Sequence, residues 1–262
     1  QYAETGGPTR STGVPQGTSI SLFLANVAAY DLDRALERLG VSFARYADDT
    51  LIWSSEYAQV CKAVDALHSL AERIGAQINV KKSSGIRLLV PSGAQAEFNS
   101  TNSIDYLGHA FFLNRVGIKS SLVLKIKKRI QKLVYFNLIR APEQGLQNPA
   151  RVARHDRDYV TFVWQLRRYM YGDVSERNLR RFALRGVPPK RFRGVMAYFP
   201  FVDAEQQLKE LDQWLLAQTF LAMKRRAQHL GLVDADYRPT IYATPIHNLT
   251  ALLDDPSAST RT

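Results

Sequence analysis

The feature that most constrains this chain is a pair of adjacent acids between two apolar segments. Residues 43–47 and 50–53 are rich in aromatic and aliphatic side chains, and Asp48 and Asp49 lie between them. A two-residue hairpin turn normally favours Asn-Gly or Asp-Gly. Neighbouring carboxylates repel each other, so this arrangement is costly unless a cation is bound. The pattern predicts a hairpin over 41–53 whose turn binds metal, although such a pair taken alone is more often a solvent-facing acidic turn.

The surrounding sequence predicts a mixed first part and a helical second part. In the first 121 residues we expect helices over 19–39 and 57–74, ended by Gly40 and Gly75, and strands at 77–80, 86–90 and within 103–112. The apolar stripe of the second helix comprises Val60, Ala63, Val64, Leu67, Leu70, Ala71 and Ile74. From Leu122 onward we expect helices near 122–133, 159–171, 176–184 and 204–226, the last capped by Asp203.

Two of these helices have apolar faces that predict a common core. Leu122, Ile126, Ile130 and Leu133 share one face of the first, and Leu208, Leu211, Trp214 and Leu215 are expected to point inward from the last. Mixed strands and helices followed by helices alone predict an α+β fold.

The charge indicates a polyanionic partner. The net charge is +11, and residues 122–193 hold 18 Lys and Arg against 5 Asp and Glu. One helical face in this block carries Lys125, Lys128, Arg129 and Lys132. No apolar stretch approaches the roughly 18 residues of a membrane span, and the single cysteine excludes an internal disulfide. These observations favour nucleic acid over a membrane as the partner.

Four motifs occur in a fixed order in the first 112 residues. Gly13-Val-Pro-Gln-Gly17 is followed by Ser21 and by Leu24-Ala-Asn26; after it come Tyr46-Ala-Asp-Asp49, Ile78-Asn-Val-Lys-Lys-Ser83 and Tyr106-Leu-Gly108. In this order and spacing they resemble the GxPQG, YxDD, LNxxK[ST] and primer-grip segments of the reverse transcriptase family.

The resemblance implies a fold and an activity. It implies a partial polymerase palm, an antiparallel sheet packed on helices, over residues 1–121, an all-α basic thumb over 122–230, and a C-terminal tail over 231–262. The implied activity is RNA-directed DNA synthesis by two-metal phosphoryl transfer, with two Mg²⁺ ions or Mn²⁺ in their place. The implied partners are an RNA template, a DNA or RNA primer and dNTPs.

The resemblance also implies individual roles. Asp48 and Asp49 would be catalytic metal ligands, and Lys82, rather than its neighbour Lys81, would protonate the leaving pyrophosphate. Residues contacting the template and the incoming nucleotide would be Pro15, Gln16, Gly17 and Tyr46. Tyr106, Leu107 and Gly108 would position the primer end, with Leu107 itself more simply explained as part of a core strand. Lys125, Lys128, Arg129 and Lys132 would contact duplex phosphates.

The chain departs from the family pattern at its beginning. The family's first catalytic aspartate and its fingers precede the GxPQG loop, so we expect a fragment or half of a split enzyme, inactive until the missing fingers and palm segment is supplied. Asp31 and Asp33 are expected at the far end of the motif helix, and Asp105 beside the primer-grip strand. Neither position matches that of the missing ligand.

The subfamily and alternative activities remain open at this point. Ala47 and the GVPQG loop suit bacterial retroelements and defence-associated enzymes of the bacterial cytoplasm, which can act in phage defence with a noncoding RNA. Leu22 replaces a proline often found after the motif serine. The alternatives are an RNA-templated RNA polymerase, a template-independent nucleotide-adding enzyme, and a catalytically inert nucleic-acid-binding relative.

Overall fold

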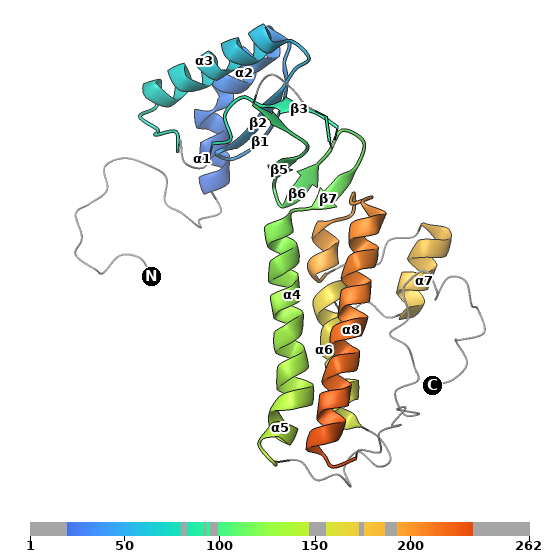
Figure 1. Cartoon of the computed structure of the whole chain (residues 1–262). Coiled ribbons are helices and arrows are strands. Elements are labelled where there is room, and N and C mark those ends of the chain that lie inside the picture. The colour runs from blue at the N-terminus through green and yellow to red at the C-terminus, as the bar shows by residue number, and fades with distance from the viewer. Residues whose placement is uncertain are drawn as a thin grey trace, which may run out of the picture. The chain divides into compact units, whose positions relative to one another are not determined.

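The chain forms two compact units. The computed structural model describes residues 20–79, 83–91, 93–94, 99–146, 156–172, 176–186 and 193–232 of the 262. The first unit, here the hairpin unit, comprises residues 1–88 and 95–101; the second, the helical unit, comprises residues 89–94 and 102–262. Helices and three small sheets occur together, which confirms the predicted α+β class (Figure 1).

The hairpin unit places two helices, an antiparallel strand pair and a third helix in sequence. Its elements are α1 (Ser21–Ala28), α2 (Tyr30–Leu39), β1 (Ser42–Tyr46), β2 (Asp49–Trp53) and α3 (Tyr57–Arg73). The single helix expected over 19–39 is wrong, because the backbone turns at Ala29 with φ −95° and ψ 4°. Gly40 ends α2 in the left-handed region at φ +68°, as predicted.

The core of the hairpin unit lies between α2, α3 and the hairpin. Leu32 and Leu36 of α2 pack with Ala63 and Leu70 of α3, and Phe43 and Ile52 of the strands lie against this cluster. The predicted apolar stripe of α3 is therefore largely confirmed. Ile74 is the exception, since α3 ends at Arg73 and its side chain is 47% exposed.

Short pairings replace two of the expected strands. Residues 77–79 form no strand, and residue 80 lies outside the described residues. Of 86–90 only β3 (Leu88–Leu89) is a strand, and it pairs with β4 (Ser100–Thr101), which was not predicted. An apolar segment forms a strand only where a neighbouring strand accepts and donates its backbone hydrogen bonds. Here the neighbouring strand, β4, is two residues long.

The sheet of the helical unit is a three-stranded antiparallel meander. The predicted pair within 103–112 is confirmed as β5 (Ile104–Tyr106) and β6 (His109–Phe111), and β7 (Val116–Ile118) adds a third strand. Asp203 was predicted to cap the last helix, which is wrong. Its Oδ1 instead accepts a hydrogen bond from the Val116 amide at 2.6 Å, and α8 (Glu205–His229) begins without a side-chain cap.

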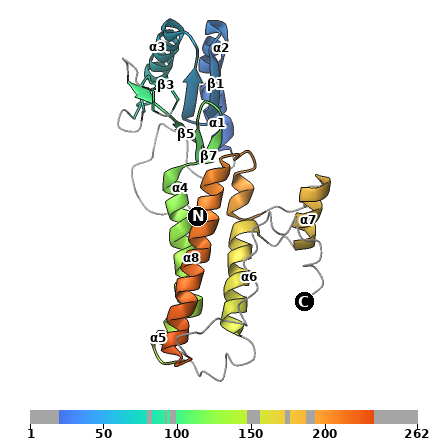
Figure 2. The same cartoon turned by 45° about the vertical axis from the view of Figure 1, so that its right-hand side comes forward.

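Three long helices pack around one apolar core. They are α4 (Ser120–Val134), α6 (Arg157–Tyr171) and α8, with α4 and α8 side by side (Figures 1 and 2). The core includes Ile126 and Ile130 of α4, Phe162 and Leu166 of α6, and Leu211 and Leu215 of α8, which confirms the predicted inward faces. Among the described residues the unit also contains the shorter elements α5 (Arg140–Glu143), α7 (Glu176–Arg185) and the 3-10 turn η3 (Val195–Tyr198). None of the described helices is long and apolar enough to cross a membrane.

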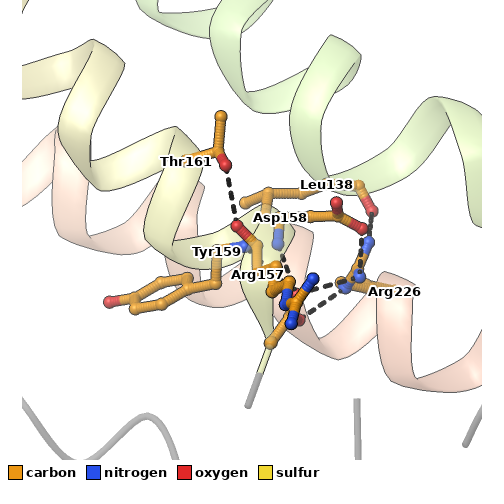
Figure 3. Close-up of polar contacts among 7 residues, drawn as sticks. Leu138, Arg157, Asp158, Tyr159, Thr161 and Arg226 are labelled. Atoms are coloured by element: carbon orange, nitrogen blue, oxygen red, sulfur yellow. Dashed lines mark hydrogen bonds and ion pairs between the residues drawn. The ribbon is translucent and has the colours of Figure 1, made fainter. Parts of the chain in front are cut away.

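A buried arginine ties these helices together. Helix α4 continues into the π-helical turn η1 (Tyr135–Ile139), and Arg226 of α8 donates to the Leu138 carbonyl within that turn at 2.9 Å (Figure 3). The same guanidinium pairs with Asp156 at 2.9 Å and with Asp158 at 2.9 Å, and the side chain of Arg226 is 1% exposed. Asp156 in turn caps α6 by accepting from the amides of Asp158 and Tyr159. Removing one partner of such a buried network typically costs about 3–5 kcal/mol.

Candidate active site and nucleic-acid interface

The two acids lie at the tip of the β1–β2 hairpin, as predicted. Tyr46 pairs with Asp49, so the turn itself is Ala47-Asp48 and Asp49 is the first residue of β2. Ala47 has a φ of +55°, in the left-handed region that a residue with a Cβ rarely adopts. This conformation costs roughly 1–2 kcal/mol, and strained positions of this kind cluster at functional sites.

The chemistry of the turn fits a divalent cation. Both Asp48 and Asp49 are exposed, as is the neighbouring Tyr46. Carboxylate oxygens are the ligands that Mg²⁺ prefers, and two adjacent carboxylates offer such oxygens at one end of the hairpin. Within the described ranges no three His, Cys, Asp or Glu side chains come together as a metal cluster. The turn therefore offers two carboxylate ligands.

A hydrogen-bonded arginine lies behind the turn. The Arg45 Nη1 donates to the Ala47 carbonyl at 3.1 Å and to the Asn26 Oδ1 at 3.0 Å. Its Nε and Nη2 donate to the two carboxylate oxygens of Asp33 at 2.8 and 2.5 Å. Asp33 was expected at the far end of the motif helix, which is wrong: because the chain breaks at Ala29, α2 brings Asp33 to the hairpin.

Sequence reasoning missed Arg45, although one signal was available. The side chain of Arg45 is only 8% exposed, in a strand whose neighbouring residues are mostly apolar. A charged residue that points inward from a strand must be paired, because an unpaired buried charge is very costly. That signal indicates a partner but does not identify Asp33 or Asn26.

The primer-grip motif forms a second tight turn. Tyr106 pairs with His109, so Leu107 and Gly108 make the β5–β6 turn with φ values of +45° and +85°. The expectation that Leu107 belongs to a core strand is wrong, since it lies at the turn and is 49% exposed. Gly108 approaches α4 closely: a Cβ placed there would lie 2.8 Å from the Leu122 Cδ1. Asp105 lies on β5, as expected, and its carboxylate is 3.4 Å from the Lys119 Nζ.

The predicted basic face of α4 is exposed to solvent. Its members, here the α4 basic face, are Lys125, Lys128, Arg129 and Lys132, and all four are exposed. None of them forms an ion pair with another described residue, and α4 contains no acid. An exposed face of cations is suited to a polyanion.

Exposed aromatic residues follow this face along the chain. Tyr135 and Phe136, in the π-helical turn, are 43% and 56% exposed, with ring centroids 5.7 Å apart. The Arg140 guanidinium lies 5.5 Å from the Phe136 ring centroid. Aromatic and cationic side chains together are the usual components of a nucleic-acid surface.

The remaining predicted site residues lie outside the described part of the chain. These are Pro15, Gln16, Gly17 and Lys82. The structure therefore brings together Tyr46, Asp48 and Asp49 in one turn, and Tyr106, Leu107 and Gly108 in another.

Comparison with known proteins finds a family match over the segment that contains both turns. Residues 2–111 match the family model described as reverse transcriptase (RNA-dependent DNA polymerase). No curated protein matches the chain. The matched segment includes the acidic turn and the β5–β6 turn. The segment that carries both turns is thus similar to the reverse transcriptase family.

Proposed function

We propose that this chain forms the palm and thumb of an RNA-directed DNA polymerase, which extends a DNA or RNA primer with dNTPs on an RNA template. The observation that carries the proposal is the exposed pair Asp48 and Asp49 at a strained hairpin turn inside the family segment. In this proposal residues 1–121 act as palm and 122–230 as thumb.

Asp48 and Asp49 would hold divalent cations, Mg²⁺ or Mn²⁺, at the exposed end of the hairpin. A pair of such ions supplies activation of the attacking hydroxyl and charge stabilisation at the leaving pyrophosphate. The protein's own contribution is to hold the carboxylates in a fixed direction, which the two-residue turn and its paired strands support. Lys82 would donate the proton that the pyrophosphate takes up on leaving.

The other motif residues would bind and orient the substrates. The α4 basic face would contact duplex phosphates, and its cations form no ion pair with the described residues that would compete with them. The Tyr106-Leu107-Gly108 turn would hold the primer end, and Pro15, Gln16, Gly17 and Tyr46 would line the templating base and nucleotide. A bacterial defence role with a noncoding RNA, in the cytoplasm, follows from the same resemblance.

Primer extension by the full-length gene product tests the proposal. Asp48→Asn and Asp49→Asn should each lower the Mg²⁺-dependent extension rate by roughly 10³-fold or more, because several kcal/mol of transition-state stabilisation depend on the ions. Affinity for primer–template should stay within about twofold, since the cationic surface is untouched. Asp65→Asn, at an exposed acid on α3 of the same unit, is the matched control and should extend like wild type.

Three results would overturn the proposal. Wild-type-like extension by both Asp variants would remove the acidic turn from the chemistry. Equal nucleotide addition with and without an RNA template would instead show a template-independent enzyme. A strict requirement for ribonucleotides would show RNA synthesis.

A further inference from the structure

We infer that Arg45 is a positioning residue that sets the direction in which the acidic turn presents its carboxylates. This inference rests on the proposed function, because it assumes that the turn carries the chemistry. The guanidinium donates hydrogen bonds to at least three groups among the described residues: the Asn26 side chain, the Asp33 carboxylate and the Ala47 carbonyl. These groups come from α1, α2 and the turn itself.

The bond to the turn acts on one peptide plane. The Ala47 carbonyl belongs to the planar peptide that joins Ala47 to Asp48. A hydrogen bond to its oxygen therefore restrains the orientation of that peptide, and with it the backbone rotation on the N-terminal side of Asp48. Ala47 is also the residue with the unfavourable φ of +55°. A strained backbone persists only where its surroundings hold it, and the donor from Arg45 is such a support.

The other bonds hold the donor in place. Both oxygens of Asp33 accept from Arg45, which is the bidentate arrangement that restrains a planar guanidinium most strongly. Asn26, the last residue of the Leu-Ala-Asn motif, shares the Nη1 with the Ala47 carbonyl. With its side chain 8% exposed, Arg45 has little freedom to move away. The motif helix is thus connected to the acidic turn through one side chain.

A lysine cannot reproduce this arrangement. It carries a single ammonium on a flexible stem and cannot bond both Asp33 oxygens and the Ala47 carbonyl in one plane. Arg45→Lys therefore keeps the charge but loses the geometry. The hairpin unit offers a matched control: Arg73 pairs with Asp31 at 2.7 Å, but these side chains are 60% and 64% exposed, and neither bonds to the turn.

The experiment compares Arg45→Lys and Asp33→Asn with Arg73→Lys and Asp31→Asn in the full-length gene product. We expect the first pair to lower the single-turnover extension rate by about 10²-fold, as small displacements of reacting groups do. The Mg²⁺ concentration for half-maximal rate should rise severalfold, whereas primer–template affinity stays unchanged. A readout independent of activity is amide hydrogen exchange, which should accelerate at Asp48 and Asp49 in the first pair only.

The outcomes separate this inference from the proposed function. Equal rates, Mg²⁺ dependence and turn exchange for Arg45→Lys and Arg73→Lys would overturn the inference, as would a lower melting temperature with unchanged kinetics. If Asp48→Asn and Asp49→Asn abolish extension in that case, the proposed function stands. If both Asp variants extend normally while Arg45→Lys loosens the turn, the support by Arg45 is real and the proposed function fails.

Discussion

Tyr171 shows how strongly the helical unit shifts the pKa of a single side chain. Burial raises the pKa of Tyr171 to about 12; the negative charge of Asp212 adds to the shift, and Arg167 opposes it. Because the folded pKa exceeds the ordinary value of 10.0, the neutral phenol stabilises the folded state. That stabilisation is complete below about pH 10 and is lost as the pH rises toward about 12.

Tyr171→Phe should remove this alkaline loss of stability. Across about pH 9 to 12, the free energy of unfolding of wild type should fall by up to about 2 kcal/mol more than that of Tyr171→Phe, since each pKa unit corresponds to about 1.4 kcal/mol. Urea unfolding at a series of pH values measures both. Tyr198→Phe, at a side chain that is 75% exposed, should follow wild type. If the free energy of unfolding changes equally with pH in wild type and in Tyr171→Phe, the raised pKa of Tyr171 is contradicted.

At the scale of one element, the α4 basic face makes a quantitative prediction. Replacing Lys125, Lys128, Arg129 and Lys132 together with Gln should weaken primer–template binding alike on every sequence, because phosphate contacts carry no base information. The slope of log affinity against log salt should flatten by roughly one unit per lost contact, so by up to about four. Binding measured by fluorescence anisotropy across a salt series gives the slope.

A charge-matched control separates local contact from net charge. Replacing Arg34, Arg38, Lys62 and Arg73 with Gln removes the same charge from exposed positions on α2 and α3. This variant should keep most of the wild-type slope. If both variants flatten the slope equally, the α4 basic face contributes only to the overall field, and its cations are ordinary solvated side chains.

Elements were predictable where their determinants are local. The acidic hairpin follows from its apolar strand sequences and the inward faces of α4 and α8 from helical periodicity, which need only neighbouring residues. Asp203 was misassigned because its partner, Val116, is 87 residues away and competes with the helix cap. The pairing of Asp33 with Arg45 depends on a helix break at Ala29 that no glycine or proline marks.

At the scale of the whole molecule, the described residues bring no third His, Cys, Asp or Glu side chain to the acidic turn, which bears on what residues 1–262 can do alone. Two bridged cations need ligands from more than one segment, and the acidic turn is one segment. A protein of only these residues should therefore bind primer–template duplex through its basic surface but not extend the primer. Binding and extension assays on the same preparation test this. Robust templated extension by it would mean that the ligand set is already complete.

The Arg226 network has a consequence for the order in which the helical unit can mature during protein synthesis. Arg226 lies 70 residues after Asp156 and 88 residues after Leu138. At roughly 5–20 residues per second, the ribosome takes about 4–14 s to go from the acid to its arginine. Throughout that interval a nascent chain that has docked α6 against α4 would bury Asp156 without a counter-charge. The synthesis and docking of α8 are thus the step that completes the core, so the helical unit finishes folding only when its C-terminal helix is available.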